Sequence, residues 1–160
     1  MQKPFILIVL LIKAVFGQLT YGQPVDIQQA SYQHKPIVEM QINNKKTWVL
    51  LDTGSDITIL DSKSKKHLGF DIVKSASRYV PGFGSENNLL HRVKNASLLF
   101  GNTALRGPMY AFDLGPIAES IQARTGKRIS AIIGTSLMQA YGFVIDLGNN
   151  SVVMYNKSRD

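Results

Sequence analysis

The sequence predicts a mostly β, single-domain protein with one to two short helices. In residues 36–43 apolar and polar residues alternate, and Val38, Met40 and Ile42 fall on one face, as in a half-buried strand. Further short apolar segments, separated by Gly, Asn and Pro, continue to residue 155, which is typical of strands and turns. Only one segment, beginning near Gly115, has clear helix start and stop signals. The 160-residue chain is long enough for one domain and shows no repeat or linker.

The first two strands are expected to form a hairpin that ends at Asp52. Turn formers at 43–46 join the first strand to a second one at Thr47–Leu51. A second hairpin is expected from Ser77–Val80 and Leu89–Val93, because the residues between them are rich in Gly, Pro and Asn. The remaining elements are expected, in chain order, as strands at Ala96–Phe100 and Met109–Phe112, a helix between Gly115 and Gly126 with Pro116 in its first turn, a buried strand at Ser130–Ile133, a helical turn or two at Thr135–Tyr141, and a hairpin of Phe143–Leu147 and Ser151–Tyr155.

The amino terminus is predicted to be a secretory signal peptide, residues 1–22. Lys3 precedes an apolar run of about nine residues, which fits such a peptide and is shorter than the roughly 20 residues that span a membrane. Cleavage could follow Gly17 or Gly22, and a buried strand or helix of the domain is the alternative interpretation of this segment. The rest of the chain, residues 23–160, is then one domain of an exported protein, periplasmic or extracellular.

Composition excludes several kinds of site. The chain has no cysteine, and its three histidines are far apart and form no HExxH pair, so no metal and no cofactor are expected. The net charge of +7 falls to +5 when Lys3 and Lys13 leave with the signal peptide. A lysine cluster at residues 63–66 has no aromatic platform beside it, which favours a solvated loop over a nucleic-acid site. We expect no nucleic-acid partner and no membrane span after signal cleavage.

The segment Leu50-Leu51-Asp52-Thr53-Gly54-Ser55-Asp56 carries the strongest chemical signal. A carboxylate at the end of a buried strand is either satisfied by several donors or used for chemistry. Two carboxylates that share one proton can act as both base and acid on a peptide bond. In this loop the Gly54 N–H and the Ser55 hydroxyl could donate to Asp52. The Thr53 hydroxyl could bond to the partner loop that supplies the second carboxylate.

Together with Ala131-Ile132-Ile133-Gly134, this loop resembles the active site of aspartic peptidases. The match is to their single-lobe, retropepsin-like branch, including its exported bacterial members, over about Pro36 to Tyr155. It implies a single-lobe closed β-barrel and an aspartic-type endopeptidase with an acidic pH optimum. The residues that it implies are Asp52, Thr53 and Gly54 as the catalytic loop, Ile132, Ile133 and Gly134 as its support, and Ser55, Asp56, Gly82, Phe83 and Gly84 as substrate-binding positions.

Because the chain has a single active-site loop, the activity that the resemblance implies requires a homodimer. One chain supplies one Asp52, and Asp146-Leu147-Gly148 lacks the hydroxyl residue of a second loop. Two copies around a two-fold axis would supply the pair of carboxylates. The substrate would be a peptide or protein.

Departures from the family pattern leave alternatives open. Thr135-Ser136 stands where the family usually has an arginine that pairs with the residue matching Asp56, so Asp56 could contact substrate or be structural. The resemblance makes the second hairpin, with Gly82-Phe83-Gly84 at its tip, a flap that closes over the substrate. Tyr79 is an alternative to Phe83 as its substrate-contacting aromatic residue. A non-catalytic peptide-binding or regulatory module with the same fold is the alternative function, and a structural Asp52 in an unrelated β domain is the third.

Overall fold

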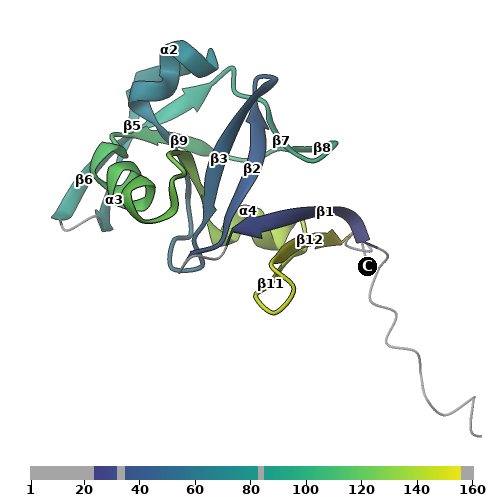
Figure 1. Ribbon diagram of the computed structural model, residues 1–160. Helices are drawn as coiled ribbons and strands as arrows, with labels where there is room; N and C mark the ends of the chain where they lie inside the picture. The colour runs from purple at the N-terminus through teal and green to yellow at the C-terminus, as the bar shows by residue number, and fades with distance from the viewer. Residues whose placement is uncertain (1–23, 32–34, 83–84, 156–160) are drawn as a thin grey trace, which may run out of the picture.

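The computed structural model describes residues 24–31, 35–82 and 85–155, and these form a mostly β protein with short helices (Figure 1). The mostly β class predicted from the sequence is confirmed. Its elements follow in chain order as β1 (Pro24–Ser31), β2 (Ile37–Ile42), β3 (Lys45–Leu51), β4 (Thr58–Asp61), η1 (Ser62–Ser64), α2 (Lys65–Leu68), β5 (Asp71–Gly82), β6 (Ser85–Lys94), β7 (Leu98–Phe100), β8 (Thr103–Leu105), β9 (Met109–Phe112), α3 (Gly115–Thr125), β10 (Ile129–Ile133), α4 (Thr135–Ala140), β11 (Phe143–Asp146) and β12 (Ser151–Tyr155).

The strands form one sheet in which many neighbouring strands are not consecutive in the chain. The hydrogen-bonded path runs β11-β12-β1-β2-β3-β10-β4-β9-β6-β5, and β7 and β8 branch from β2. Its two ends, β11 and β5, do not pair with each other in the described part of the chain. The closed barrel expected from the resemblance is therefore not confirmed.

The centre of the sheet brings two distant loops together. Strand β10 lies parallel to β3, with Ile132 opposite Leu50 and Ile133 opposite Leu51. On its other side β10 is antiparallel to β4. Because the carboxyl ends of parallel strands meet at the same edge, the loop that follows Leu51 lies beside the one that follows Ile133.

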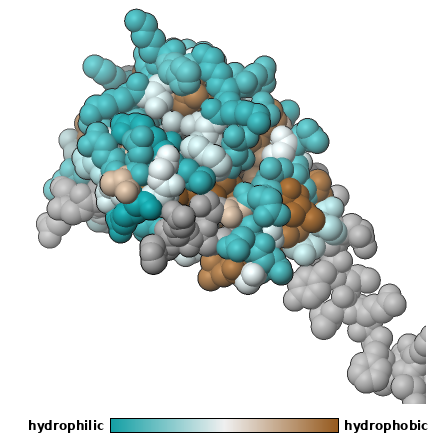
Figure 2. All heavy atoms as spheres, viewed as in Figure 1, coloured by the Kyte–Doolittle hydropathy of each residue, from teal (hydrophilic) through white to brown (hydrophobic). Residues whose placement is uncertain are grey.

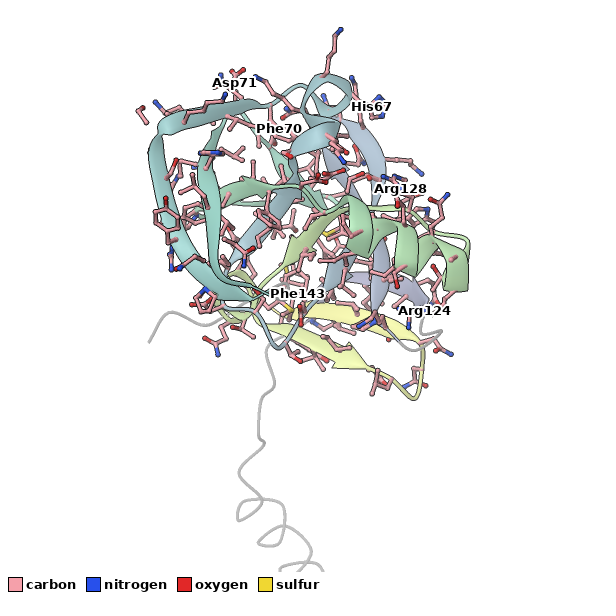
Figure 3. All side chains as sticks on the ribbon, turned by 90° about the vertical axis from the view of Figure 1, so that its left-hand side faces the viewer. His67, Phe70, Asp71, Arg124, Arg128 and Phe143 are labelled. Carbon is pink, nitrogen blue, oxygen red and sulfur yellow. The ribbon has the colours of Figure 1, made fainter. Side chains whose placement is uncertain are left out.

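Alternating side chains of these central strands pack into two apolar clusters. Val49 and Leu51 of β3 contribute to one cluster, while Leu50 contributes to the other. The second cluster includes Ala118 and Ile121, so α3 covers this face of the sheet, as Figure 3 also shows. Burial on both faces explains why residues 49–51 at the end of β3 and 131–133 at the end of β10 are continuous apolar runs.

Two regions differ from the sequence expectations. The hairpin of β5 and β6 is much longer than the segments predicted around residues 77–80 and 89–93, and it bends at irregularities in its register. Strand β1 was not expected; it pairs with β12 through residues 24–29 and with β2 through Ala30 and Ser31. It thereby joins the carboxyl-terminal hairpin to the main sheet. None of the helices in the described ranges has the length and apolar character needed to cross a membrane.

Candidate active site

The loop after β3 holds Asp52 with few constraints on its carboxylate. The Asp52 N–H donates to the Ile133 carbonyl at 3.0 Å, and the Ser55 N–H donates to the Asp52 carbonyl at 3.2 Å. These main-chain bonds fix the turn, while the half-buried carboxylate accepts from the Gly54 N–H through Oδ1 at 2.9 Å. The expected bond from Gly54 is thus present, and the carboxylate retains oxygen lone pairs for other partners.

The loop after β10 is hydrogen-bonded to the loop that contains Asp52. The Thr135 N–H donates to the Ser55 carbonyl at 2.7 Å, and the Gly134 N–H donates to the Thr58 hydroxyl at 3.3 Å. A Cβ at position 134 would lie 2.4 Å from the Ile57 carbonyl oxygen, far inside any normal contact. Glycine is therefore required there for the two loops to approach. Ile133 and Ile132 are buried behind this junction.

The Ser55 hydroxyl differs from its sequence expectation. It donates to the Ile57 carbonyl at 3.1 Å and accepts from the Ile57 N–H at 3.4 Å, and it does not bond to Asp52. The reason is local, because a serine hydroxyl readily closes a turn with main-chain groups two residues on. The Ser55 donor expected for Asp52 is therefore absent, and the acidic pH optimum stays a prediction of the family resemblance alone. Thr53 is exposed, and its predicted bond to a partner loop stays a prediction.

Asp61 is a structural carboxylate, buried and fully hydrogen-bonded, and it serves as a comparison for Asp52. It is only 2% exposed. Its oxygens accept from the Lys63 N–H, the Ser64 hydroxyl and the Leu114 N–H, each at 3.2 Å. Asp52 is more exposed, and its carboxylate accepts one hydrogen bond from the described residues, so its environment differs from that of a structural acid.

Asp56 lies on the exposed side of the loop and lines a cavity of about 230 Å³. Arg78 from β5, Arg106 from the loop before β9, and Tyr110 from β9 line the same cavity. Asp56 forms no ion pair with a basic side chain among residues 24–31, 35–82 and 85–155. None of Arg78, Arg106 and Tyr110 is predicted as a site residue, since no local sequence pattern places them near the Asp52 loop.

The long β5–β6 hairpin occupies the position of the expected flap. Gly82 has a φ of +129°, and nothing would lie within 4 Å of a Cβ there, so this glycine is needed for backbone conformation and not for space. Phe83 and Gly84, the other predicted flap positions, lie outside the described residues. Tyr79 on β5 is 69% exposed.

Comparisons with solved structures identify the fold. The chain superposes on a retropepsin-like aspartic protease from Rickettsia conorii with a TM-score of 0.51 and 18% identity, covering 81% of this chain and 88% of the other. The retroviral protease-like domain of Ddi1 from Leishmania major gives a TM-score of 0.50 and 14% identity, covering 84% of this chain and 99% of the other. At these identities the similarity concerns the fold. No curated protein sequence matches the chain.

Family membership rests on the sequence match. Residues 38–137 match the family described as aspartyl protease, and this range contains the Asp52 loop, the β5–β6 hairpin and Gly134. The range is more than half of the chain, and the retropepsin-like resemblance drawn from the motifs is confirmed. The chain belongs to the aspartyl protease family.

Proposed function

We propose that two copies of this chain form an aspartic endopeptidase whose active site is a pair of Asp52 carboxylates. The observation that carries the proposal is the state of Asp52, which is partly exposed and accepts one hydrogen bond from its own loop. The β3–β10 junction holds the loop rigidly through Ile133 and Ser55 while leaving this carboxylate for a reaction. A main chain fixed by hydrogen bonds together with a partly exposed carboxylate is more typical of a catalytic residue than of a structural one.

In the proposed reaction the two Asp52 carboxylates share one proton. Like charges about 3 Å apart cannot both ionise, so one carboxylate is a base and the other an acid. The base removes a proton from a water molecule as its oxygen attacks the carbonyl carbon of the peptide, and the acid gives its proton to the carbonyl oxygen. In the resulting diol, one hydroxyl gives its proton back to the ionised carboxylate while the protonated carboxyl gives its proton to the nitrogen. The C–N bond breaks, a carboxylic acid and an amine leave, and the pair again holds one proton.

The surface beside the Asp52 loop supports a second copy as the partner. A cavity of about 410 Å³ lies there, lined by Thr53 and by apolar side chains that include Met138, Phe143 and Ile145. Met138 is buried, but Phe143 and Ile145 are partly exposed, and partly exposed apolar side chains that line a cavity are expected at a subunit interface.

A second apolar row lies on the other face of the terminal strands, because Val144 stands between Phe143 and Ile145 in β11 and its side chain points away from theirs. Ile27 of β1 and Val144 of β11 both lie opposite Val153 of β12, which places the three side chains in one row across the sheet. Ile27 is 55% exposed and Val144 is 44% exposed. Figure 2 shows hydrophobic side chains gathered on the side of the molecule where β1 and β12 lie in Figure 1. We place the dimer contact on the terminal strands, which carry this row on one face and line the cavity beside Thr53 with Phe143 and Ile145 on the other.

The proposal includes export. Its support is the sequence of residues 1–22, with Lys3 ahead of a short apolar run. The protein would then act in the periplasm or outside the cell.

The decisive experiment compares peptide cleavage by residues 23–160 with cleavage by Asp52→Asn. The substitution keeps the size of the side chain but cannot serve as a base, so we expect cleavage to fall to background while the urea unfolding curve stays unchanged. Asp71→Asn is the matched control: this exposed carboxylate accepts from Asn95 at 2.6 Å and lies at the far end of β5 (Figure 3). It should keep full activity.

Protein concentration supplies a second test. Because two chains build one site, the specific activity should rise with concentration until the dimer is saturated. Full cleavage by Asp52→Asn would refute the mechanism, and a specific activity independent of dilution would refute the dimer. A chain that binds peptides without cutting them, and that pepstatin does not affect, would favour the peptide-binding module.

A further inference from the structure

The cavity next to Asp56 lies where a substrate side chain would enter. It is bounded by the loop that follows Asp52, by Arg78 on the β5–β6 hairpin, and by Arg106 before β9. If peptide lies between the Asp52 loop and this hairpin, as the proposed function requires, a side chain near the cleaved bond points into it. Its volume of about 230 Å³ is below the 300–1,000 Å³ typical of small-molecule sites, which suits a single side chain.

The charge of this cavity is positive. Arg78 and Arg106 both line it, against a single acidic residue, Asp56. The three ion pairs of the described chain involve other residues, so neither guanidinium is neutralised by a described carboxylate. An arginine fork without a carboxylate partner is well suited to bind one from a ligand through two parallel hydrogen bonds.

Tyr110 holds one of these guanidinium groups in place. The guanidinium carbon of Arg78 lies 5.4 Å from the centre of the Tyr110 ring, and that of Arg92 lies 5.6 Å from it. Hydrogen bonding from Arg78 is the largest cause that lowers the pKa of the Tyr110 hydroxyl, and the nearby charge of Arg92 acts in the same direction. Two cations on one ring repel each other, so an anion in the cavity would relieve that repulsion.

We propose that this cavity binds the carboxylate of a glutamate or aspartate side chain of the substrate, through Arg78 and Arg106. The inference rests on the proposed function, because it assigns a subsite to that same active site. It makes the two arginines specificity-determining residues and the substrate an acidic peptide. A basic side chain, which Asp56 alone would attract, is the competing occupant.

The test is cleavage of a pool of random dodecapeptides at pH 6, where glutamate is ionised because its ordinary pKa is about 4.3. We expect cleaved peptides to be enriched in Glu and Asp at one fixed distance from the cut. For a peptide pair that differs only by Glu or Gln at that position, kcat/KM should favour Glu about tenfold, which one charge-assisted hydrogen bond at a solvated site can supply. The preference should fall in 1 M salt and below about pH 4, as the charge is screened or lost.

Arg78→Gln and Arg106→Gln should each reduce the ratio of kcat/KM for the Glu peptide to kcat/KM for the Gln peptide. Arg124→Gln is the matched control, because it removes the same charge from the outer face of α3, well away from the β5–β6 hairpin in Figure 3. It should keep the preference. Equal cleavage of both peptides, enrichment of Lys or Arg, or a preference unaffected by both substitutions would overturn the inference while leaving the peptidase in place.

Binding separates a failure of the subsite from a failure of the peptidase. The same peptide pair is titrated, with a fluorescent label, against the wild-type chain and Asp52→Asn. Tighter binding of the Glu peptide that depends on Arg78 and Arg106, without any cleavage, would support the subsite and reject the proposed function. Equal binding of both peptides would reject the subsite whether or not cleavage occurs.

Discussion

Gly134→Ala tests whether the contact between the two central loops determines both stability and active-site geometry. The new Cβ would lie 2.4 Å from the Ile57 carbonyl oxygen and 2.6 Å from the Ile57 nitrogen. Ordinary contacts begin at 3.4 Å, so one of the loops has to move by about 1 Å. Both are tied down, because Ile57 exchanges hydrogen bonds with the Ser55 hydroxyl and Ser55 accepts from Thr135.

The expected magnitude follows from this forced shift. Overpacking in a closely packed site costs about 1–3 kcal/mol of unfolding free energy. A displacement of about 1 Å at a catalytic group can cost on the order of a hundredfold in rate, so kcat/KM should fall by about that factor. The first quantity is measured by urea unfolding followed by circular dichroism, and the second by cleavage of one defined peptide.

Gly148→Ala is the control for adding a methyl group elsewhere. Its Cβ would have Asp146 Oδ1 as nearest neighbour at 3.5 Å, an ordinary contact, so we expect little change in unfolding free energy. If Gly134→Ala unfolds at the same urea concentration as the wild type and retains its activity, the steric argument for the loop junction is wrong.

Two further predictions concern carboxylates remote from the reaction. Asp61→Ala should lower the unfolding free energy by about 1–3 kcal/mol, because the buried Leu114 N–H loses its acceptor at 3.2 Å; unchanged urea unfolding would contradict this. Hydrogen bonding from Lys63 lowers the pKa of Asp113 from 3.8, so their ion pair stabilises the fold above that pH and the stabilisation disappears as pH falls through the lowered folded-state pKa. Both side chains are largely exposed, so Lys63→Met should cause only a small loss of Tm near neutral pH that shrinks as the pH falls, and a loss that does not change with pH would count against the pair.

The central part of the fold could be predicted because local signals and packing agree there. The strands predicted at 47–51 and 130–133 end in short apolar runs before turn residues, and the structure buries residues 49–51 of β3 and 131–133 of β10 in the two faces of the sheet. The helix around Gly115 to Gly126 was likewise predicted from its end signals, and α3 ends with Gly126 at a φ of +72°. In both regions the sequence pattern and the tertiary environment favour the same element.

The remaining features depend on contacts that no local pattern encodes. Strand β1 contains as many polar as apolar residues, and its pairing with β12 joins residues more than 120 positions apart in the chain. Arg78 and Arg106 each resemble an ordinary solvated charge until β5 and β9 bring them to one cavity. The predicted hydrogen bond from Ser55 to Asp52 is wrong because of a local contact and not a distant one. The Ser55 hydroxyl donates instead to the main-chain carbonyl of Ile57, two residues away.

Strand β12 has a consequence for how the proposed dimer would assemble. Its two edges are already occupied, by β11 on one side and β1 on the other, both from its own chain. Copies therefore need not exchange terminal strands to associate, and each can complete its folding before it meets another. Dilution would then yield intact, idle single chains that regain function on concentration, without any step of refolding.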